Sequence, residues 1–260
     1  MRFSSIAGLI AAALAVCTGQ AQILISDTFT GANGTLISAH TPDTNLPGGI
    51  YIVNGTGWGS GTIQNNTLSQ NTDMGVGISL ASSGSYTKPT NLTISADLNI
   101  GTLTGDVVHA NGVGLGFYVM PNNAAFHGGS GFLGLILSPT GNLSFTSIDT
   151  SGSYIKTVIQ TFTYSGTWDA AVNHSLSYSV NTTTGNFSNI LLDSITYGFS
   201  STALFTDTAT TYAGLSVSSS TGSKYGYVDN FQINPEPSTF SLLVLGGLAL
   251  VPFLRRRAHR

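Results

Sequence analysis

Cysteine is almost absent from this sequence. The 260 residues contain one, Cys17, and it lies in an apolar N-terminal segment that we expect to be cleaved off. The mature chain therefore has no disulfide bond. Removing the apolar segments at both ends leaves roughly 210 residues, which suits one large all-β domain that buries about 70% of its unfolded surface. A hydrophobic core alone can hold such a domain together.

Basic residues and glutamate are also scarce. Between residues 22 and 233 the chain has three lysines, ten aspartates and no glutamate, so this stretch carries a net charge of about −7. A protein that binds nucleic acid needs a cationic face to displace the counterions of the phosphates. We therefore exclude nucleic acid as a partner.

Signatures of nucleophilic and zinc chemistry are missing as well. The same stretch has no cysteine nucleophile and no Gly-x-Ser-x-Gly string, and its four histidines, His40, His109, His127 and His174, are isolated from one another. No His-x-His or His-Glu-x-x-His spacing marks a zinc site. We interpret His174 as a surface or hydrogen-bonding residue at the start of a strand. A Ser-His-Asp triad assembled in space leaves no such spacing, so that alternative stays open.

The N-terminal segment, residues 1–21, has the three parts of a secretory signal peptide. Arg2 supplies a positive charge, residues 6–16 are apolar, and the segment ends in Gly-Gln-Ala. This pattern predicts cleavage after Ala21 and export of the rest. A buried core helix and lipoprotein processing at Cys17 are the alternatives, and the bulky Val16 before that cysteine disfavours the second.

Three features follow one another at the C-terminus: a Pro-Glu-Pro motif, an apolar run and an arginine cluster. In order they are Pro235, Glu236 and Pro237, then residues 240–254, then Arg255, Arg256 and Arg257. As a helix the apolar run is about 22 Å long, short for a hydrocarbon core of ~30 Å but sufficient for a transient anchor. The arginines stay in the cytoplasm under the positive-inside rule, which leaves the domain outside.

These three features together resemble the PEP-CTERM sorting domain, which covers residues 234–260 here. The resemblance implies a biofilm-forming bacterium with an outer membrane. It also implies processing near the Pro-Glu-Pro motif by an exosortase, a membrane-embedded protease, after a transient stay in the inner membrane. The processed protein then reaches the cell surface or the exopolysaccharide matrix. An ordinary tail anchor with a proline-rich entry turn is the alternative.

Between the two ends, apolar and polar residues alternate with a period of two. Residues 92–100 place five apolar side chains on one face and Thr, Ser, Asp and Asn on the other, and residues 113–119, 133–137 and 176–180 repeat the pattern. Turn sequences rich in Gly, Asn, Ser and Thr separate them. Half-buried strands joined by tight turns are predicted, with no convincing helical period. The fold class is all-β.

The arrangement of these segments resembles the jelly-roll β-sandwich of concanavalin A-like (LamG-like) domains. The resemblance rests on residues 27–68, on an expected hairpin over residues 173–193 and on a closing strand over residues 227–233. It implies that the first and last strands pair, so that both ends of the domain lie together. It also suggests structural calcium, which such domains often bind.

Enzymes of this fold class, the laminarinase-like glucanases, carry a Glu-x-Asp-x-Glu strand whose two carboxyls attack and protonate the glycosidic bond. The domain has no glutamate, and no two of its aspartates are spaced i, i+2 or i, i+4. Asp97 and Asp106 are the nearest pair in sequence. We therefore predict no catalytic residues.

Four residues are candidates for binding. Trp58 and Trp168 could stack on the apolar face of a sugar ring, or they could pack in the core. Asp27 and Asp229 lie on the strands expected to pair and could share a calcium ion, or they could be solvated strand-end carboxylates.

The sequence thus predicts a signal peptide (1–21), a jelly-roll β-sandwich (22–233) and a sorting signal with a transmembrane helix (234–260). We expect an exported, non-catalytic surface or matrix protein that binds carbohydrate and needs no cofactor other than the calcium considered above. A structural or adhesive matrix protein without a sugar site is one alternative, and a diverged glycan hydrolase is another.

Overall fold

The computed structural model describes residues 22–54, 61–70, 74–81, 86–103, 112–119, 132–148, 156–199, 211–218 and 225–236. The expected signal peptide, Trp58, Pro237, the apolar run and the arginine cluster lie outside these residues. Within them, no helix is long and apolar enough to cross a membrane.

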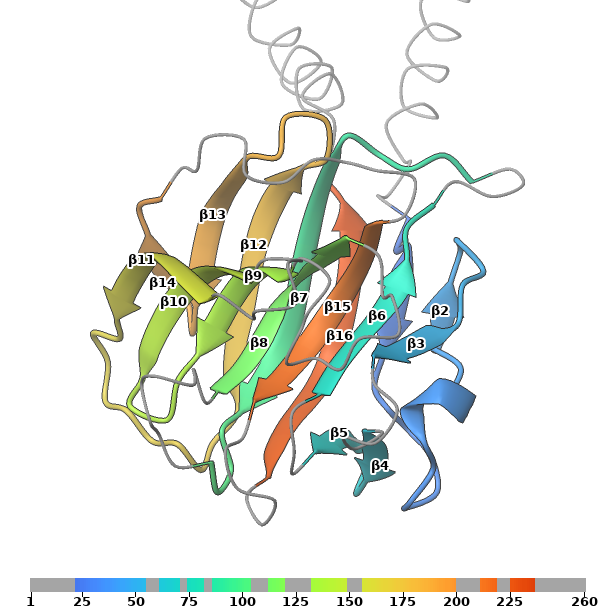
Figure 1. The fold of residues 1–260 in the computed structure, drawn as a ribbon, viewed down its shortest axis with the longest axis horizontal. Coiled ribbons are helices and arrows are strands. Elements are labelled where there is room, and N and C mark those ends of the chain that lie inside the picture. Colours follow the sequence, from blue (N-terminus) through green and yellow to red (C-terminus); the bar gives the residue numbers. More distant parts are fainter. Residues whose placement is uncertain are drawn as a thin grey trace, which may run out of the picture.

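Two antiparallel sheets pack face to face (Figure 1). Sheet A has the order β14 (Ile195–Tyr197), β13 (Phe187–Leu192), β12 (His174–Asn181), β7 (Asn91–Asn99), β16 (Gly226–Pro235), β1 (Ile25–Asp27) and β2 (Thr44–Asn45), with β5 (Thr67–Gln70) also on β16 and β4 (Thr62–Gln64) on β5. Sheet B has the order β11 (Lys156–Thr163), β10 (Asn142–Ile148), β9 (Phe132–Leu137), β8 (Gly112–Val119), β15 (Thr211–Ser218), β6 (Met74–Ser79) and β3 (Tyr51–Asn54).

The prediction of an all-β sandwich is confirmed, and the alternation of side chains explains it. Along β7, Leu92, Ile94, Ala96 and Leu98 are buried, while the residues between them face outward. The expected hairpin over residues 173–193 is β12 paired with β13. A strand with one apolar face is stable only when that face is covered, and the second sheet covers it here.

The first and last strands pair, as predicted. Ile25 lies opposite Ile233, and the backbone N–H of Leu24 donates to the carbonyl of Ile233 at 3.0 Å. The two ends of the domain therefore lie side by side at one end of sheet A.

The hydroxyl of Tyr178 forms a hydrogen bond that crosses the core between the sheets. Tyr178 on β12 is fully buried, and its hydroxyl donates to the carbonyl of Leu115 on β8 at 2.9 Å. The ring also stacks on Phe187 and meets the edge of Phe117. A buried tyrosine hydroxyl needs such a partner, because leaving it unpaired costs about 1–3 kcal/mol.

Part of the outer face of sheet B, at β9, is buried as well, which the leucine pattern of β9 did not indicate. Phe132 and Ile136 point away from the main core, yet they are 0% and 4% exposed. The Phe132 ring lies over the backbone of Gly116 and Gly134, where a Cβ atom would come within 2.6 and 2.8 Å of it. Only glycine leaves room for this ring on the sheet.

We therefore predict that Gly116→Ala destabilises the domain by about 1–3 kcal/mol, because the new methyl group overpacks the Phe132 ring and the Leu133 carbonyl. For a domain of this size, thermal denaturation should show a loss of roughly 2–12 °C in Tm. Gly198→Ala is the matched control, since its Cβ meets nothing within 4 Å. Equal Tm values for the two variants would contradict the prediction.

Candidate functional site

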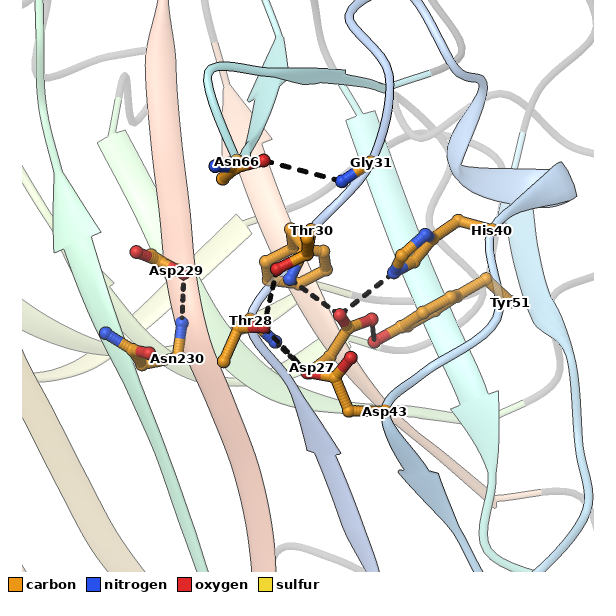
Figure 2. Close-up of polar contacts among 11 residues, drawn as sticks. Asp27, Thr28, Thr30, Gly31, His40, Asp43, Tyr51, Asn66, Asp229 and Asn230 are labelled. Carbon is orange, nitrogen blue, oxygen red and sulfur yellow. Dashed lines mark hydrogen bonds and ion pairs between the residues drawn. The ribbon is translucent and has the colours of Figure 1, made fainter.

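A buried carboxylate, that of Asp27, lies at the end of β1 and is 1% exposed. Its Oδ1 accepts a hydrogen bond from the backbone N–H of Phe29 at 2.7 Å and lies 2.9 Å from Nε2 of His40. Its Oδ2 accepts a hydrogen bond from the hydroxyl of Tyr51 at 2.8 Å (Figure 2). Both oxygens are therefore fully engaged by protein donors.

The surroundings of Asp27 make this cluster a structural one. Burial raises the pKa of Asp27, and the hydrogen bonds from His40, Tyr51 and Phe29 oppose that rise. Burial and the neighbouring carboxylate also raise the pKa of Tyr51. Asp27 and Tyr51 are buried and the side chain of His40 is 8% exposed, so little of the cluster faces solvent. The Tyr51–Asp27 hydrogen bond ties β1 of sheet A to β3 of sheet B.

A second aspartate fixes the loop after β1. Oδ2 of Asp43 accepts hydrogen bonds from the hydroxyl of Thr28 at 2.7 Å and from its backbone N–H at 2.9 Å (Figure 2). These bonds lower the pKa of Asp43. The Asp43 carboxylate therefore stabilises the loop through these two hydrogen bonds.

Two aspartates of sheet A meet on its outer, solvent-facing side. Asp97 on β7 lies directly opposite Asp229 on β16, and a β-bulge follows, in which Asn230 has φ 50°. The Asn230 backbone N–H donates to Asp229 at 2.7 Å, and its side-chain amide donates to Asp97 at 2.8 Å. Burial raises the pKa of Asp229, and the Asp97 carboxylate adds to the rise. Asparagine tolerates the left-handed conformation that this bulge needs.

An aromatic pair comes four and two residues before Asp229 in the sequence. Tyr225 precedes β16 and is 40% exposed, while Tyr227 is half-buried and lies, like Asp229, on the outer side of the strand. The two rings stack with centroids 6.3 Å apart and an interplanar angle of 17°. We refer to Tyr225, Tyr227, Asp97, Asp229 and Asn230 as the Tyr–Asp surface.

The two calcium candidates are separated by the sheet itself. Asp27 lies opposite the buried Phe231 and faces the interior, whereas Asp229 faces outward. Calcium takes six to eight oxygen ligands, and both oxygens of Asp27 already accept hydrogen bonds. In the described part of the chain, no three His, Cys, Asp or Glu side chains are grouped so as to hold a metal ion. These two residues do not fit a shared calcium ion.

Of the two tryptophan candidates, Trp58 lies outside the described residues and Trp168 is half-buried against the core. The Trp168 indole N–H donates to the carbonyl of Pro139 at 2.9 Å. Its ring stacks on His174 with centroids 4.3 Å apart and an angle of 14°. That ring face is therefore closed to a sugar.

His174 is buried, with 2% of its surface exposed, and its ring nitrogens face two acceptors. Nδ1 lies 2.6 Å from the carboxylate of Asp193, and Nε2 lies 2.9 Å from the carbonyl oxygen of Asp169. Burial tends to raise the pKa of Asp193, but hydrogen bonds from His174, Tyr164 and the backbone of Ser175 lower it overall. Both ring nitrogens of His174 thus face oxygen atoms, while the ring itself stacks on the Trp168 indole.

Sequence reasoning missed the Tyr–Asp surface because its members are distant along the chain. A search for aspartates at i, i+2 or i, i+4 cannot find Asp97 and Asp229, which meet across two strands. The sequence did hold one signal. Tyr225, Tyr227 and Asp229 occupy every second position, with Gly226 and Val228 between them, as side chains on one face of a strand do.

Two antiparallel sheets with paired first and last strands define a lectin-type jelly-roll sandwich. Solved structures with a similar fold include the exoplasmic/lumenal domain of VIP36 in a metal-free form (TM-score 0.52, 11% identity, 84% of this chain and 95% of that chain). The Emp47p carbohydrate recognition domain is also similar (TM-score 0.50, 10% identity, 84% of this chain and 98% of that chain).

The binding domain of botulinum neurotoxin serotype G matches 86% of this chain at 14% identity with a TM-score of 0.47, and this chain spans 50% of its length. No protein-family model and no curated protein sequence matches the chain. These likenesses show the fold alone.

We predict that Asp193→Asn destabilises the domain by about 1–3 kcal/mol at neutral pH, because it removes the carboxylate that faces Nδ1 of His174 and accepts hydrogen bonds from the Tyr164 hydroxyl and the Ser175 N–H. The folded-state pKa of Asp193 is lowered, so its contribution is present above the unfolded pKa of about 4 and is lost as the pH falls through the folded-state value. Denaturant unfolding across the pH range should show the two proteins converging in acid.

Asp169→Asn is the control for this prediction. Asp169 is exposed, and an asparagine there keeps both its backbone carbonyl and an oxygen for the N–H of Ala171. We expect a change within about 0.5 kcal/mol. A difference between wild type and Asp193→Asn that stays constant down to strongly acidic pH would contradict the assignment.

Proposed function

We propose that this chain is an exported, non-catalytic protein of the bacterial cell surface or exopolysaccharide matrix, and that it binds carbohydrate through the Tyr–Asp surface. The observation that carries the proposal is the stacked pair of Tyr225 and Tyr227, with Tyr227 on the same outward side of β16 as Asp229, which lies opposite Asp97. A tyrosine ring covers the apolar face of a sugar ring and keeps a hydroxyl for hydrogen bonding.

Hydrogen-bonding groups of the right kind lie beside the rings. Asp97 and Asp229 present carboxylate oxygens that accept bonds from sugar hydroxyls, and Asn230 fixes their positions through its backbone and its side-chain amide. Groups held in place before binding lose less entropy when a ligand arrives. This arrangement favours recognition of adjacent hydroxyls on one sugar.

The charge of the domain favours a neutral glycan over an anionic one. Three lysines stand against ten aspartates between residues 22 and 233, and two of those aspartates belong to the Tyr–Asp surface. Uronate or sulfate groups would meet like charges, which cost binding free energy. The similar fold of the Emp47p carbohydrate recognition domain supports a sugar ligand without naming one.

The export part of the proposal rests on the terminal segments. The signal peptide of residues 1–21 and the Pro-Glu-Pro, apolar and arginine features of residues 234–260 have the order that an exported, sorted protein requires. An exosortase-type membrane protease is the proposed partner, and the inner membrane is a transient anchor.

A glycan array followed by titration calorimetry tests the binding. We expect a neutral oligosaccharide to bind, and the double variant Tyr225→Ala/Tyr227→Ala to weaken binding by at least about tenfold, since truncating a central aromatic contact typically costs more than 1 kcal/mol. Ile50→Ala, which changes a side chain that is 69% exposed and lies outside the Tyr–Asp surface, should bind like wild type. Unchanged affinity in the double variant, or no glycan bound at all, would refute the site.

One observation favours a second candidate, glycan hydrolysis. Residues directly opposite on antiparallel strands have Cβ atoms about 4.5–5.5 Å apart, and retaining glycosidases place their two carboxyls about 5–5.5 Å apart. Asp97 and Asp229 are such a pair, and the raised pKa of Asp229 suits a general acid.

Release of reducing ends from neutral polysaccharides decides between the candidates. If the chain hydrolyses glycans, Asp229→Asn should lower the rate by about 10²–10⁴-fold, because it removes the proton donor. Thr93→Ala changes a side chain on the outer side of β7, four residues from Asp97, and should leave the rate unchanged. If wild-type protein releases no reducing ends, hydrolysis is rejected and the binding proposal stands.

A further inference from the structure

The first two residues of the Pro-Glu-Pro motif, Pro235 and Glu236, are part of the folded domain. Strand β16 runs from Gly226 to Pro235, and Pro235 lies opposite Leu92 of β7. The backbone N–H of Glu236 then donates to the carbonyl of Asn91 at 3.1 Å. Proline has no N–H to give to a ladder, so the Glu236 bond is the one that closes this end of the strand.

Neighbouring contacts hold this strand end on both sides. Ile233 is fully buried, lies opposite Ile94 on β7 and Ile25 on β1, and its carbonyl accepts the N–H of Leu24. Leu92, the cross-strand partner of Pro235, is fully buried too. The chain therefore has no loose linker between the hydrophobic core and Glu236.

A sheet-bound segment is a poor protease substrate. Cleavage needs the main chain around the cut bond to be free, so a hydrogen-bonded strand is cut only in the fraction of molecules that have opened locally. The segment up to Glu236 is bound, and a backbone hydrogen bond holds Glu236 itself.

We propose that sheet A sets the upstream limit of C-terminal processing, so that the tail is removed at a peptide bond C-terminal to Glu236 and the mature protein keeps a complete β16. This inference rests on the proposed sorting of the chain. The step is a hydrolysis: the peptide C–N bond breaks, and water supplies the hydroxyl of the new carboxyl group and the hydrogen of the amine left on the tail.

Hydrogen–deuterium exchange resolved to single amides, measured on the full chain in detergent micelles, tests whether the sheet holds Glu236. We expect the Glu236 amide to exchange at least about tenfold more slowly than in a synthetic peptide of residues 229–240, because the ladder must open first. Leu92→Ala should remove this protection, whereas Thr93→Ala, an adjacent outward-facing position, should keep it. Exchange at the peptide rate in wild-type protein would overturn the inference.

Intact mass of the protein recovered from cells that contain the sorting protease tests the cut itself. A mature C-terminus at Glu236 or beyond supports the inference, and a C-terminus at Pro235 or upstream overturns it. Recovery of the full-length chain alone would count against the proposed sorting, and the exchange experiment would still decide whether the motif is held by the sheet. The two failures are therefore distinguishable.

Discussion

The pairing of β1 with β16 is the contact on which this domain depends. It joins the first and last strands of sheet A, and the buried carboxylate of Asp27 fixes β1 to sheet B through the Tyr51 hydroxyl. A carboxylate removed from water is tolerated only when donors surround it, so Asp27, His40 and Tyr51 work as a unit. With β1 in place, residues 231–233 of β16 have a neighbouring strand on both sides, which orders the chain up to Glu236; the stretch that carries Tyr227 lies between β7 and β5 instead.

The parts of the fold that the sequence predicted were those encoded locally. The alternation in β7 and the pairing of the terminal strands were both confirmed, because a period of two follows directly from the geometry of a half-buried strand. The candidate site was harder to predict. Asp97 and Asp229 are 132 positions apart, and only the register of the sheet brings them together. His174 marked the start of a strand, but nothing local showed that it is buried or what it binds.

Low charge shapes both the interior and the surface of this domain. In the described residues, polar groups near the core occur in small closed sets, such as His174 with the Asp193 carboxylate and the indole of Trp168. The outer side of sheet A carries short hydroxyl and amide side chains between its few carboxylates. Such a surface has weak long-range fields, so it selects partners by contact geometry more than by electrostatic attraction. That behaviour suits a protein surrounded by neutral polymer.

The bulge at Asn230 changes which side chains face outward on β16 but leaves the inward-facing core residues in place. In a regular strand, consecutive side chains point to opposite faces, but here Asp229 and Asn230 both lie outward, because β16 uses one more residue than β7 across this step. Removing that extra residue would restore plain alternation, with Val228 and Phe231 still inward. A chain with or without this one residue would therefore keep the same core and differ only in the side chains that the outer side of β16 presents.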